Sequence, residues 1–517
     1  MSKKLPIGIQ SFEKIRSDNF YYVDKTYFVA KLVNEGCYYF LSRPRRFGKS
    51  LFLDTLRQAF LGKKELFSGL YLENNWDWSV SYPVISIDFS GAVIEDSNHL
   101  KKYIFEQLEE NQAELGVSCQ KKEDYNLYFR KLILEVSKKK AQKLVVLIDE
   151  YDKPILDRIE DREEALRIRE ILKNFYGALK PLDKYLKFVF LTGVSKFSKV
   201  SLFSGLNQLN DITLDERYAT ICGYTQGELE EVFGEELRGE DLEAVRCWYN
   251  GYCWLGEPVY NPFDILLYLQ KKKFHPYWFE TGTPEFLVKL LVKKRFYIPE
   301  LTELRASERL IGSFDVDAIE PENLLFQTGY LTIKRYRQSL RGLVYYLGYP
   351  NKEVQIALND YISAYLTQAE TEKQRLTERL EECLGKGDLE GFREILRSLF
   401  ASIPYEWYRS NEIAHYEGYY ASVVYSFLAG AGFDLVAEDY TSKGRIDLAI
   451  MYEEKCYIIE FKVVELEPEG KALEQIERKN YAEKYRGRFE RIYLVGIEFS
   501  KEQKDLVAFE WKEVGKN

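Results

Sequence analysis

The sequence predicts a multidomain α/β protein with a parallel sheet at the front, a mostly helical middle and a compact α/β region at the end. Its 517 residues, at about 150 residues per domain, are enough for roughly three or four domains. Apolar strand-like runs alternate with helical stretches near the front, which is typical of a parallel sheet covered by helices. Near the end, two apolar strands flank a short polar turn, which indicates a hairpin.

Composition excludes several classes of protein. Hydrophobic residues make up 46% and charged residues 30%, the balance of a folded rather than a disordered chain. A net charge of −9 argues against a protein that coats nucleic acid by charge alone. The charge is uneven, with 11 basic against 5 acidic residues over 1–60 and 16 against 22 over 401–517. Seven scattered cysteines without a zinc pattern fit a reducing cytoplasm, and we expect no membrane span.

The front region, residues 1–225, is predicted to form the parallel sheet. An apolar, aromatic run is followed by a polar turn and by apolar residues at helical spacing, which indicates strand, loop and helix in that order. Further strands alternate with helices. Strands are expected at 37–41, 84–89, 144–148 and 188–191, and helices at 51–60, 98–115, 123–140 and 161–179.

The middle region, residues 226–400, is predicted to be helical, with a winged-helix-like module where helix-like ENLLFQ precedes two strand-like runs over 320–349. The charged stretch 370–397 is expected to be helical and to serve as connector or packing surface. Residues 401–517 are expected to form a separate domain. There the sequence predicts helices at 417–428 and 471–485 and strands at 447–452, 457–463 and 491–497.

The first candidate site, RPRRFGKS over residues 43–50, follows the first strand. Set against G-x-x-x-x-G-K-[ST], it keeps Gly48, Lys49 and Ser50 but has Arg43 in place of the first glycine. The unpaired amides of the following helix can bind phosphate oxygens, Lys49 can reach the β- and γ-phosphates, and the Ser50 hydroxyl can ligate Mg²⁺. The three arginines are expected to add positive charge there. A helix N-terminus with a surface lysine is the alternative.

An apolar strand ending in two acids would complete this site. Asp149 would hold Mg²⁺ through water, and Glu150 would polarise the attacking water; an acidic helix cap is the alternative. At the end of another strand, the Thr192 hydroxyl could sense the terminal phosphate, or the segment is a capped turn. The residues expected to bind the nucleotide are Arg46, Phe47, Gly48, Lys49, Ser50, Asp149 and Thr192.

The second candidate site lies in the last region. GRIDLAI carries Asp447, and YIIEFK follows with Glu460 and Lys462. Side chains alternate along a strand, so Glu460 and Lys462 share a face, and pairing of the strands brings Asp447 beside Glu460. Two such carboxylates create a site for Mg²⁺, which can generate hydroxide. A surface hairpin with a charge pair does not explain acids in apolar strands, because unpaired buried charges are costly.

Neighbouring residues extend this second site. Glu417, in the first turn of the preceding helix, is a candidate third carboxylate and metal ligand, although an acid there also suits a helix N-terminus. Gln475 and Tyr481 follow the strand pair and could contact a nucleic-acid backbone, or face solvent and the sheet. His415 is a further candidate phosphate contact, with a surface histidine as the alternative.

These motifs resemble known families. LPIGIQSFEKIRSDNFYYVDKTYFVAKL, LSRPRRFGKS and VVLIDEYDKPI resemble AAA-ATPase-like proteins of bacteria and archaea, where RPRRFGKS is characteristic, so the missing glycine is a family trait. GRIDLAI, YIIEFK and ALEQIERKNYAEKY are similar to the PD-(D/E)XK nuclease-superfamily domain that accompanies this ATPase-like domain.

The resemblance implies a P-loop NTPase sheet and a C-terminal restriction-endonuclease-like α/β domain, joined by the helical and winged-helix-like middle. It implies ATP and Mg²⁺ as cofactors, with Mn²⁺ as an alternative ion at the nuclease site. The motif residues carry over as Asp447, Glu460 and Lys462, with Glu417 as the helix acid and Gln475 after the core.

Our leading hypothesis is a cytoplasmic, nucleotide-regulated, Mg²⁺-dependent nuclease that acts on DNA, in which ATP bound at the front gates cleavage at the end. One alternative is a nucleotide-sensing switch or scaffold with slow or absent ATP turnover. Another is RNA cleavage, because carboxylate–metal chemistry does not select the sugar. A homo-oligomer is compatible with the sequence, whereas a membrane partner is not expected.

Overall fold

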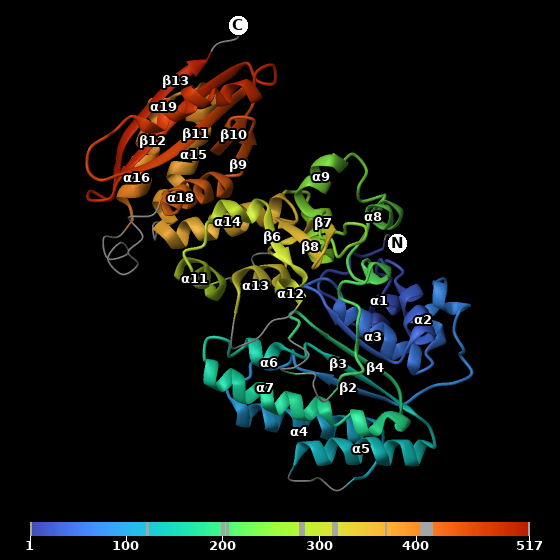
Figure 1. The fold of residues 1–517 in the computed structure, drawn as a ribbon. Helices are drawn as coiled ribbons and strands as arrows, with labels where there is room; N and C mark the ends of the chain where they lie inside the picture. The colour runs from blue at the N-terminus through green and yellow to red at the C-terminus, as the bar shows by residue number, and fades with distance from the viewer. Residues whose placement is uncertain are drawn as a thin grey trace. The chain divides into compact units, whose positions relative to one another are not determined.

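The computed structural model describes residues 3–119, 124–197, 202, 206–278, 285–312, 319–367, 370–403 and 417–514 (Figure 1). The chain forms two units, which are described separately: Met1–Thr281 with Arg305–Asn351, and Gly282–Leu304 with Lys352–Asn517. Within the described ranges, no helix is long and apolar enough to cross a membrane.

The first unit is built on a five-stranded parallel sheet of order β2-β3-β4-β1-β5. Strand β3 is buried along its whole length, as expected for an apolar run in a parallel sheet covered on both faces. The order β3-β4-β1 brings the carboxyl ends of these three strands to one edge. The strands are β1 (Tyr38–Ser42), β2 (Val84–Asp88), β3 (Leu144–Asp149), β4 (Leu186–Gly193) and β5 (Asn210–Asp211).

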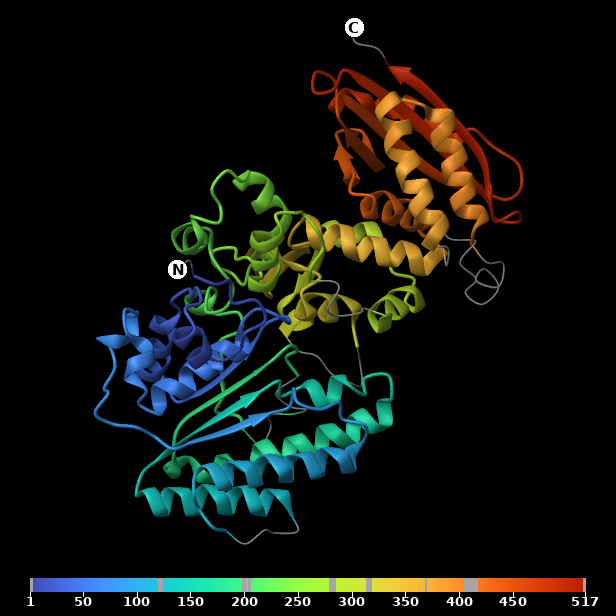
Figure 2. The same cartoon turned by 180° about the vertical axis from the view of Figure 1, so that it is seen from behind.

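Helices cover both faces of this sheet (Figures 1 and 2). Three of them begin after an aspartate whose side chain accepts hydrogen bonds from the first backbone amides, namely Asp96, Asp124 and Asp161, which stabilises a helix N-terminus. One face carries α1 (Phe12–Ser17), α2 (Thr26–Glu35) and α3 (Lys49–Phe60); the other carries α4 (Ser97–Glu114), α5 (Tyr125–Lys140) and α7 (Arg162–Gly177), with α6 (Lys153–Leu156) before α7.

The rest of the first unit contains several short helices, in line with the helical middle region that the sequence predicts, and the helix-plus-hairpin module. Strand β8 lies between β6 and β7 in a three-stranded sheet, and most residues of α13 are buried. Residues of α8, α9 and α10 share one apolar core with Tyr21 and Val23. The elements are α8 (Gln226–Phe233), α9 (Leu242–Tyr249), α10 (Pro262–Lys271), β6 (Leu304–Ser307), α12 (Glu308–Gly312), α13 (Pro321–Thr328), β7 (Thr332–Ser339) and β8 (Gly342–Gly348).

The second unit is built on a mixed sheet of order β13-β12-β11-β10-β9. Its central strands β10 and β11 form an antiparallel hairpin with Leu448 opposite Ile459, and β11 runs parallel to β12. Helix α19 packs against β11 and β12. The strands are β9 (Asp434–Thr441), β10 (Gly444–Tyr452), β11 (Lys455–Val464), β12 (Arg491–Ser500) and β13 (Leu506–Val514).

Two helical segments of this unit are broken where the sequence suggested continuity. The charged stretch over 370–397 is helical as expected but forms two helices, because the chain turns at Gly387 and Asp388 caps the second helix. The helix expected over 471–485 ends at Lys479, because Asn480 takes a left-handed conformation. The helices are α11 (Glu285–Lys293), α14 (Lys352–Thr367), α15 (Glu370–Lys386), α16 (Leu389–Ala401), α18 (Glu417–Gly430) and α19 (Lys471–Lys479).

Candidate functional sites

The phosphate-loop motif joins the end of β1 to the start of α3. Gly48 takes a left-handed conformation with φ of +88°, which favours glycine. No side chain caps α3, so its first amides remain available to an anion. The Lys49 ammonium donates to the Pro44 carbonyl oxygen at 3.2 Å and lies 3.4 Å from a Glu150 carboxylate oxygen.

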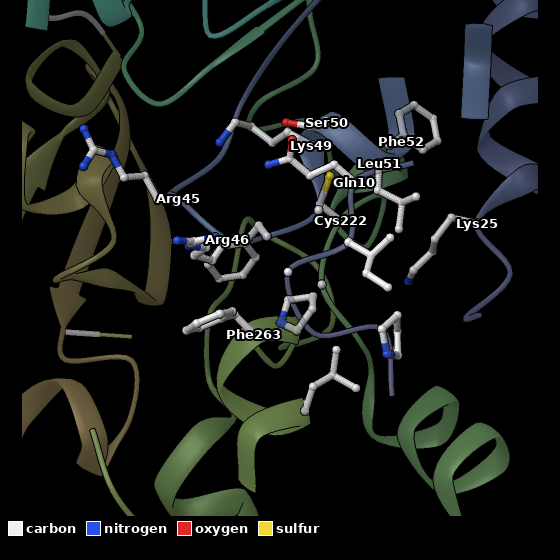
Figure 3. Close-up of a pocket in the computed structure, with 18 of the residues that line it drawn as sticks. Gln10, Lys25, Arg45, Arg46, Lys49, Ser50, Leu51, Phe52, Cys222 and Phe263 are labelled. Atoms are coloured by element: carbon white, nitrogen blue, oxygen red, sulfur yellow. The ribbon is translucent and has the colours of Figure 1, made fainter. Parts of the chain in front are cut away.

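A cavity of about 360 Å³ opens beside this loop (Figure 3). The loop residues 45–50 and Glu150 line it, together with a set of apolar and aromatic side chains. The Arg46 guanidinium lies over the Phe263 ring at 4.8 Å. Cavities of this size and character suit a small organic anion. The apolar and aromatic lining includes Pro6, Ile9, Tyr21, Tyr22, Pro262 and Phe263.

Arg43, which replaces the first glycine of the motif, does not line this cavity, contrary to the expectation that it adds charge at the phosphates. Its side chain is fully buried. It donates to the carbonyl oxygens of Thr213 at 2.8 Å and Tyr218 at 3.2 Å and lies over the Trp254 ring at 4.2 Å. Burial lowers the pKa of Arg43 to about 10, so the guanidinium stays charged at neutral pH. Arg43 therefore joins the start of the loop to the 213–218 segment and to Trp254.

The acidic strand end lies against the same loop. Burial together with the Glu150 charge raises the pKa of Asp149 to about 7, although the nearby Ser50 hydroxyl and the Lys49 ammonium act to lower it. Glu150 has a φ of +48°, a strained conformation for a non-glycine residue and one that clusters at functional sites. Asp149 and Glu150 thus meet the loop as the sequence predicted.

A fully buried aspartate that the sequence analysis did not single out joins two strand ends. Asp152 accepts hydrogen bonds from the backbone amides of Val194 at 3.1 Å and Ser195 at 2.6 Å, and from the Ser195 hydroxyl. Thr192 is fully buried, and its hydroxyl has no hydrogen-bond partner in the part of the chain that the structure describes. It does not line the cavity, whereas Val194 does. Asp152 therefore ties the segment after β3 to the segment after β4.

The second site lies on the β10–β11 hairpin. The register that pairs Leu448 with Ile459 sets Asp447 beside Glu460, and the Phe461 amide donates to Asp447 Oδ2 at 2.9 Å. The Lys462 ammonium lies 3.4 Å from Glu460 Oε1 and 3.7 Å from Glu417 Oε1. Four charged side chains, Asp447, Glu460, Lys462 and Glu417, therefore meet as the strand pattern predicted.

Burial raises the pKa values of the three carboxyl groups at this site. Glu460 is 1% exposed, and burial and the Asp447 charge raise its pKa to about 8. Burial also raises the pKa of Asp447 and of Glu417. Burial alone lowers the pKa of Lys462, but the three carboxylates outweigh it, so the pKa is raised overall and the lysine stays charged.

The carboxylates fit a hard divalent cation. Glu460 Oε2 is buried and has no hydrogen-bond partner among the described residues, and an oxygen left in this way beside a second carboxylate is suited to Mg²⁺ or Mn²⁺. Among the described residues, no three His, Cys, Asp or Glu side chains form a ready-made metal cluster. Asp447 and Glu460 thus lie where they could hold such an ion together, and Glu417 contacts Lys462.

Helix α19 completes the second site. The Gln475 amide donates to Glu460 Oε1. Two residues of β12 hold the helix: Gly496, where a Cβ would lie 2.4 Å from the Leu473 nitrogen, and the buried Glu498, which accepts from the Glu469 and Ala472 amides.

Two of the flanking candidates have different placements. Tyr481 is 2% exposed, and its hydroxyl donates to the Arg445 carbonyl at 2.9 Å, so the ring packs against the end of the sheet. His415 lies outside the described residues. Sequence reasoning missed Glu498 and Arg445, although both carry a charge within or beside an apolar strand, the signal that revealed Glu460.

The fold and the two sites define a class of protein in which an ATPase-like domain precedes a nuclease-superfamily domain. The family model described as predicted AAA-ATPase matches residues 6–203, and that of the PD-(D/E)XK nuclease superfamily matches residues 415–509. The chain belongs to this AAA-ATPase-like family and carries a C-terminal domain of the PD-(D/E)XK superfamily. It is 49% identical over 514 residues, 99% of both chains, to the "Uncharacterized protein in vnfD 5'region" of Azotobacter chroococcum mcd 1.

Proposed function

We propose that the protein binds and hydrolyses ATP and cleaves DNA phosphodiesters with Mg²⁺ under nucleotide control. The observation that carries the nuclease proposal is Glu460: a buried carboxylate, with one oxygen unpartnered, beside Asp447 and Lys462. A structural charge pair does not call for this arrangement, because a buried carboxylate oxygen without a partner destabilises a fold.

Each residue of the hairpin has a chemical role in this proposal. Asp447 and Glu460 would hold the ion, which would supply a hydroxide nucleophile and stabilise charge on the phosphate. The Gln475 amide donates to Glu460 Oε1 and so orients this carboxylate, which leaves Glu460 Oε2 for the ion. Lys462, whose pKa is raised overall, stabilises the negative charge that develops on the phosphate under attack. Glu417 keeps the Lys462 ammonium in place.

Metal-dependent cleavage by single variants tests the nuclease proposal. We expect Asp447→Asn and Lys462→Ala to lower Mg²⁺- or Mn²⁺-dependent cleavage of DNA at least about 100-fold, because each removes a group that acts on the reacting phosphate. Lys455→Ala is the matched control, because this lysine pairs with Glu453 at the other end of the same hairpin. Wild-type cleavage rates in both site variants would overturn the proposal.

ATP binding is proposed at the phosphate-loop cavity, with Lys49 on the phosphates, Ser50 and Asp149 at Mg²⁺ and Glu150 beside the attacking water. We expect Lys49→Ala to abolish binding, and Glu150→Gln to retain binding but lose phosphate release. Lys131→Ala, which removes an ion-paired lysine on α5, is the control. Turnover by Lys49→Ala at the wild-type rate would contradict this assignment.

A nucleotide-sensing switch is the second candidate function. The observation that favours it is the contact between Lys49 and Glu150, which ties the residue proposed to polarise water to the loop itself. Tight ATP binding by the wild-type chain without steady-state phosphate release would support the switch over the ATPase. Comparing DNA with RNA of the same sequence decides between the DNA nuclease and the RNA-directed alternative.

A further inference from the structure

We propose that the β9–β10 hairpin binds an unpaired nucleotide beside the scissile phosphodiester, with Arg445 on a phosphate and Tyr440 stacked on the base. The inference rests on the proposed nuclease function and extends it to the substrate-binding surface. The chemistry that it requires, a phosphodiester and an exposed base, is shared by DNA and RNA, so both serve as probes below.

Strand geometry brings these two side chains to the carboxylate site. Arg445 precedes Asp447 by two residues on β10, and alternation along a strand directs both to one face. Arg445 lies close enough to oppose the rise in the pKa of Asp447. The register then places Tyr440 of β9 directly opposite Arg445, and Tyr440 lies close enough to contribute to the raised pKa of Arg445. A cation and an aromatic ring therefore lie together next to Asp447.

Tyr440 is unusually exposed for an aromatic residue. Its side chain is 73% exposed, more than any other aromatic side chain in the described ranges, and it makes no ring–ring contact there. Its backbone is nevertheless held, since Lys484 donates to the Tyr440 carbonyl at 2.9 Å. A fixed backbone carrying a solvated ring is suited to base stacking, which needs a flat surface but no particular base.

The charges around the hairpin turn can accommodate a phosphate. Arg445 pairs with Glu438 at 3.0 Å, and the two side chains are 48% and 27% exposed, so this contact is weak and a phosphate can displace it through stronger bidentate hydrogen bonds. Lys443 at the turn is exposed and forms no ion pair within the described residues. The nearby Asp439 is already neutralised by Lys484 and bonded by the Tyr485 hydroxyl.

Binding to the cleavage-deficient Asp447→Asn chain tests the proposal directly. The probes are labelled single-stranded DNA, single-stranded RNA and duplex DNA of one sequence, in Mg²⁺. We expect Tyr440→Ala to weaken single-strand binding about tenfold and Tyr440→Phe to preserve it, because phenylalanine keeps the ring. We expect Arg445→Ala to weaken binding and to reduce the slope of log affinity against log salt by about one, with Arg445→Lys retaining most of that slope.

Matched controls come from β12 and β13, at the opposite edge of the same sheet from β9. Arg491 pairs with Glu513 at 2.8 Å as Arg445 pairs with Glu438, and Trp511 is 42% exposed. Arg491→Ala and Trp511→Ala should bind like the parent chain. In the wild-type background, Tyr440→Ala should raise KM for single strands more than it lowers kcat. Thermal unfolding of each variant identifies any loss that comes from misfolding.

The outcomes separate this inference from the proposed function. If Tyr440→Ala and Arg445→Ala bind and cleave like their parents, the hairpin is not the contact surface. A loss that is equal on duplex and single-stranded probes overturns base stacking. If wild-type chain shows no Asp447-dependent cleavage, the nuclease assignment fails instead, and binding by the Asp447→Asn chain still reports on the hairpin. The stronger of the DNA and RNA responses identifies the sugar.

Discussion

Glu460, the residue proposed to bind the metal, lowers the stability of the folded chain at high pH. Its side chain is buried, and burial and the Asp447 charge raise its pKa to about 8. The pKa of an ordinary glutamate is about 4.3. The folded protein therefore holds a proton on Glu460 that the unfolded chain loses at lower pH. The contribution of Glu460 to the free energy of unfolding consequently falls as pH rises between these two pKa values, and it is constant above about pH 8.

We predict that Glu460→Gln stabilises the metal-free protein, and more so in alkali. At about 1.4 kcal/mol for each unit of pH, the gain in free energy of unfolding should grow by about 2–3 kcal/mol between pH 6 and pH 9. Denaturant unfolding in EDTA measures it, with Glu453→Gln on the exposed turn of the same hairpin as control. Equal gains at both pH values would contradict the raised pKa, and Mn²⁺ should reduce the difference at pH 9.

The proximity of Asp447 and Glu460 could be predicted from the sequence, because acids in apolar strands and a short polar turn set both face and register. The burial of Arg43 could not, because its partners Thr213 and Tyr218 lie about 170 residues away. Glu498 carries a charge in an apolar strand, but its role could not be predicted, because the Glu469 and Ala472 amides that it accepts from lie 29 and 26 residues away.

At the scale of elements, α19 depends on a close approach to β12. A Cβ on Gly496 would lie 2.4 Å from the Leu473 nitrogen, and backbone cannot yield as a flexible side chain does. The same helix delivers Gln475 to Glu460, so its position affects the site as well as the fold.

We predict that Gly496→Ala lowers the free energy of unfolding by about 1–3 kcal/mol, the usual cost of overpacking, and lowers metal-dependent cleavage. Gly227→Ala is the control, because a Cβ there meets nothing within 4 Å. Unfolding and cleavage are measured on both variants. A Gly496→Ala chain with unchanged stability would show that α19 is not held in this way.

Elements with strong periodicity were predictable and their ends were not. Strands β1 to β4 and helices α4, α5 and α7 follow apolar patterns and agree with expectation. The edge strands β9 and β13 were missed because exposed edge strands carry mixed residues without a clear apolar alternation. The breaks at Gly387 and Asn480 depend on local backbone conformation, which charged helical patterns conceal.

At the scale of the whole molecule, the chain contains two units with a sheet and a core of their own. Each proposed ligand belongs to one unit: the nucleotide to the first, and the metal of the carboxylate site to the second. Ligand binding stabilises the folded state by mass action, so each ligand should act on the unit that binds it.

We predict two thermal transitions that respond to different ligands. ATP at 100 times its Kd should stabilise the first unit by about 2.7 kcal/mol, and Mn²⁺ alone should shift the transition of the second unit. Calorimetry on wild type, Lys49→Ala and Asp447→Asn assigns each shift to its site. A single transition moved by either ligand would show instead that the units unfold together.

The buried Arg43 has a consequence for engineering. Replacing Arg43 by glycine would restore the consensus motif but remove a buried guanidinium and its contacts at the start of the loop. The vacated space would leave the Thr213 and Tyr218 carbonyls without their donor and Trp254 without its stacked cation. In this protein, agreement with a consensus is a poor guide to a working phosphate loop.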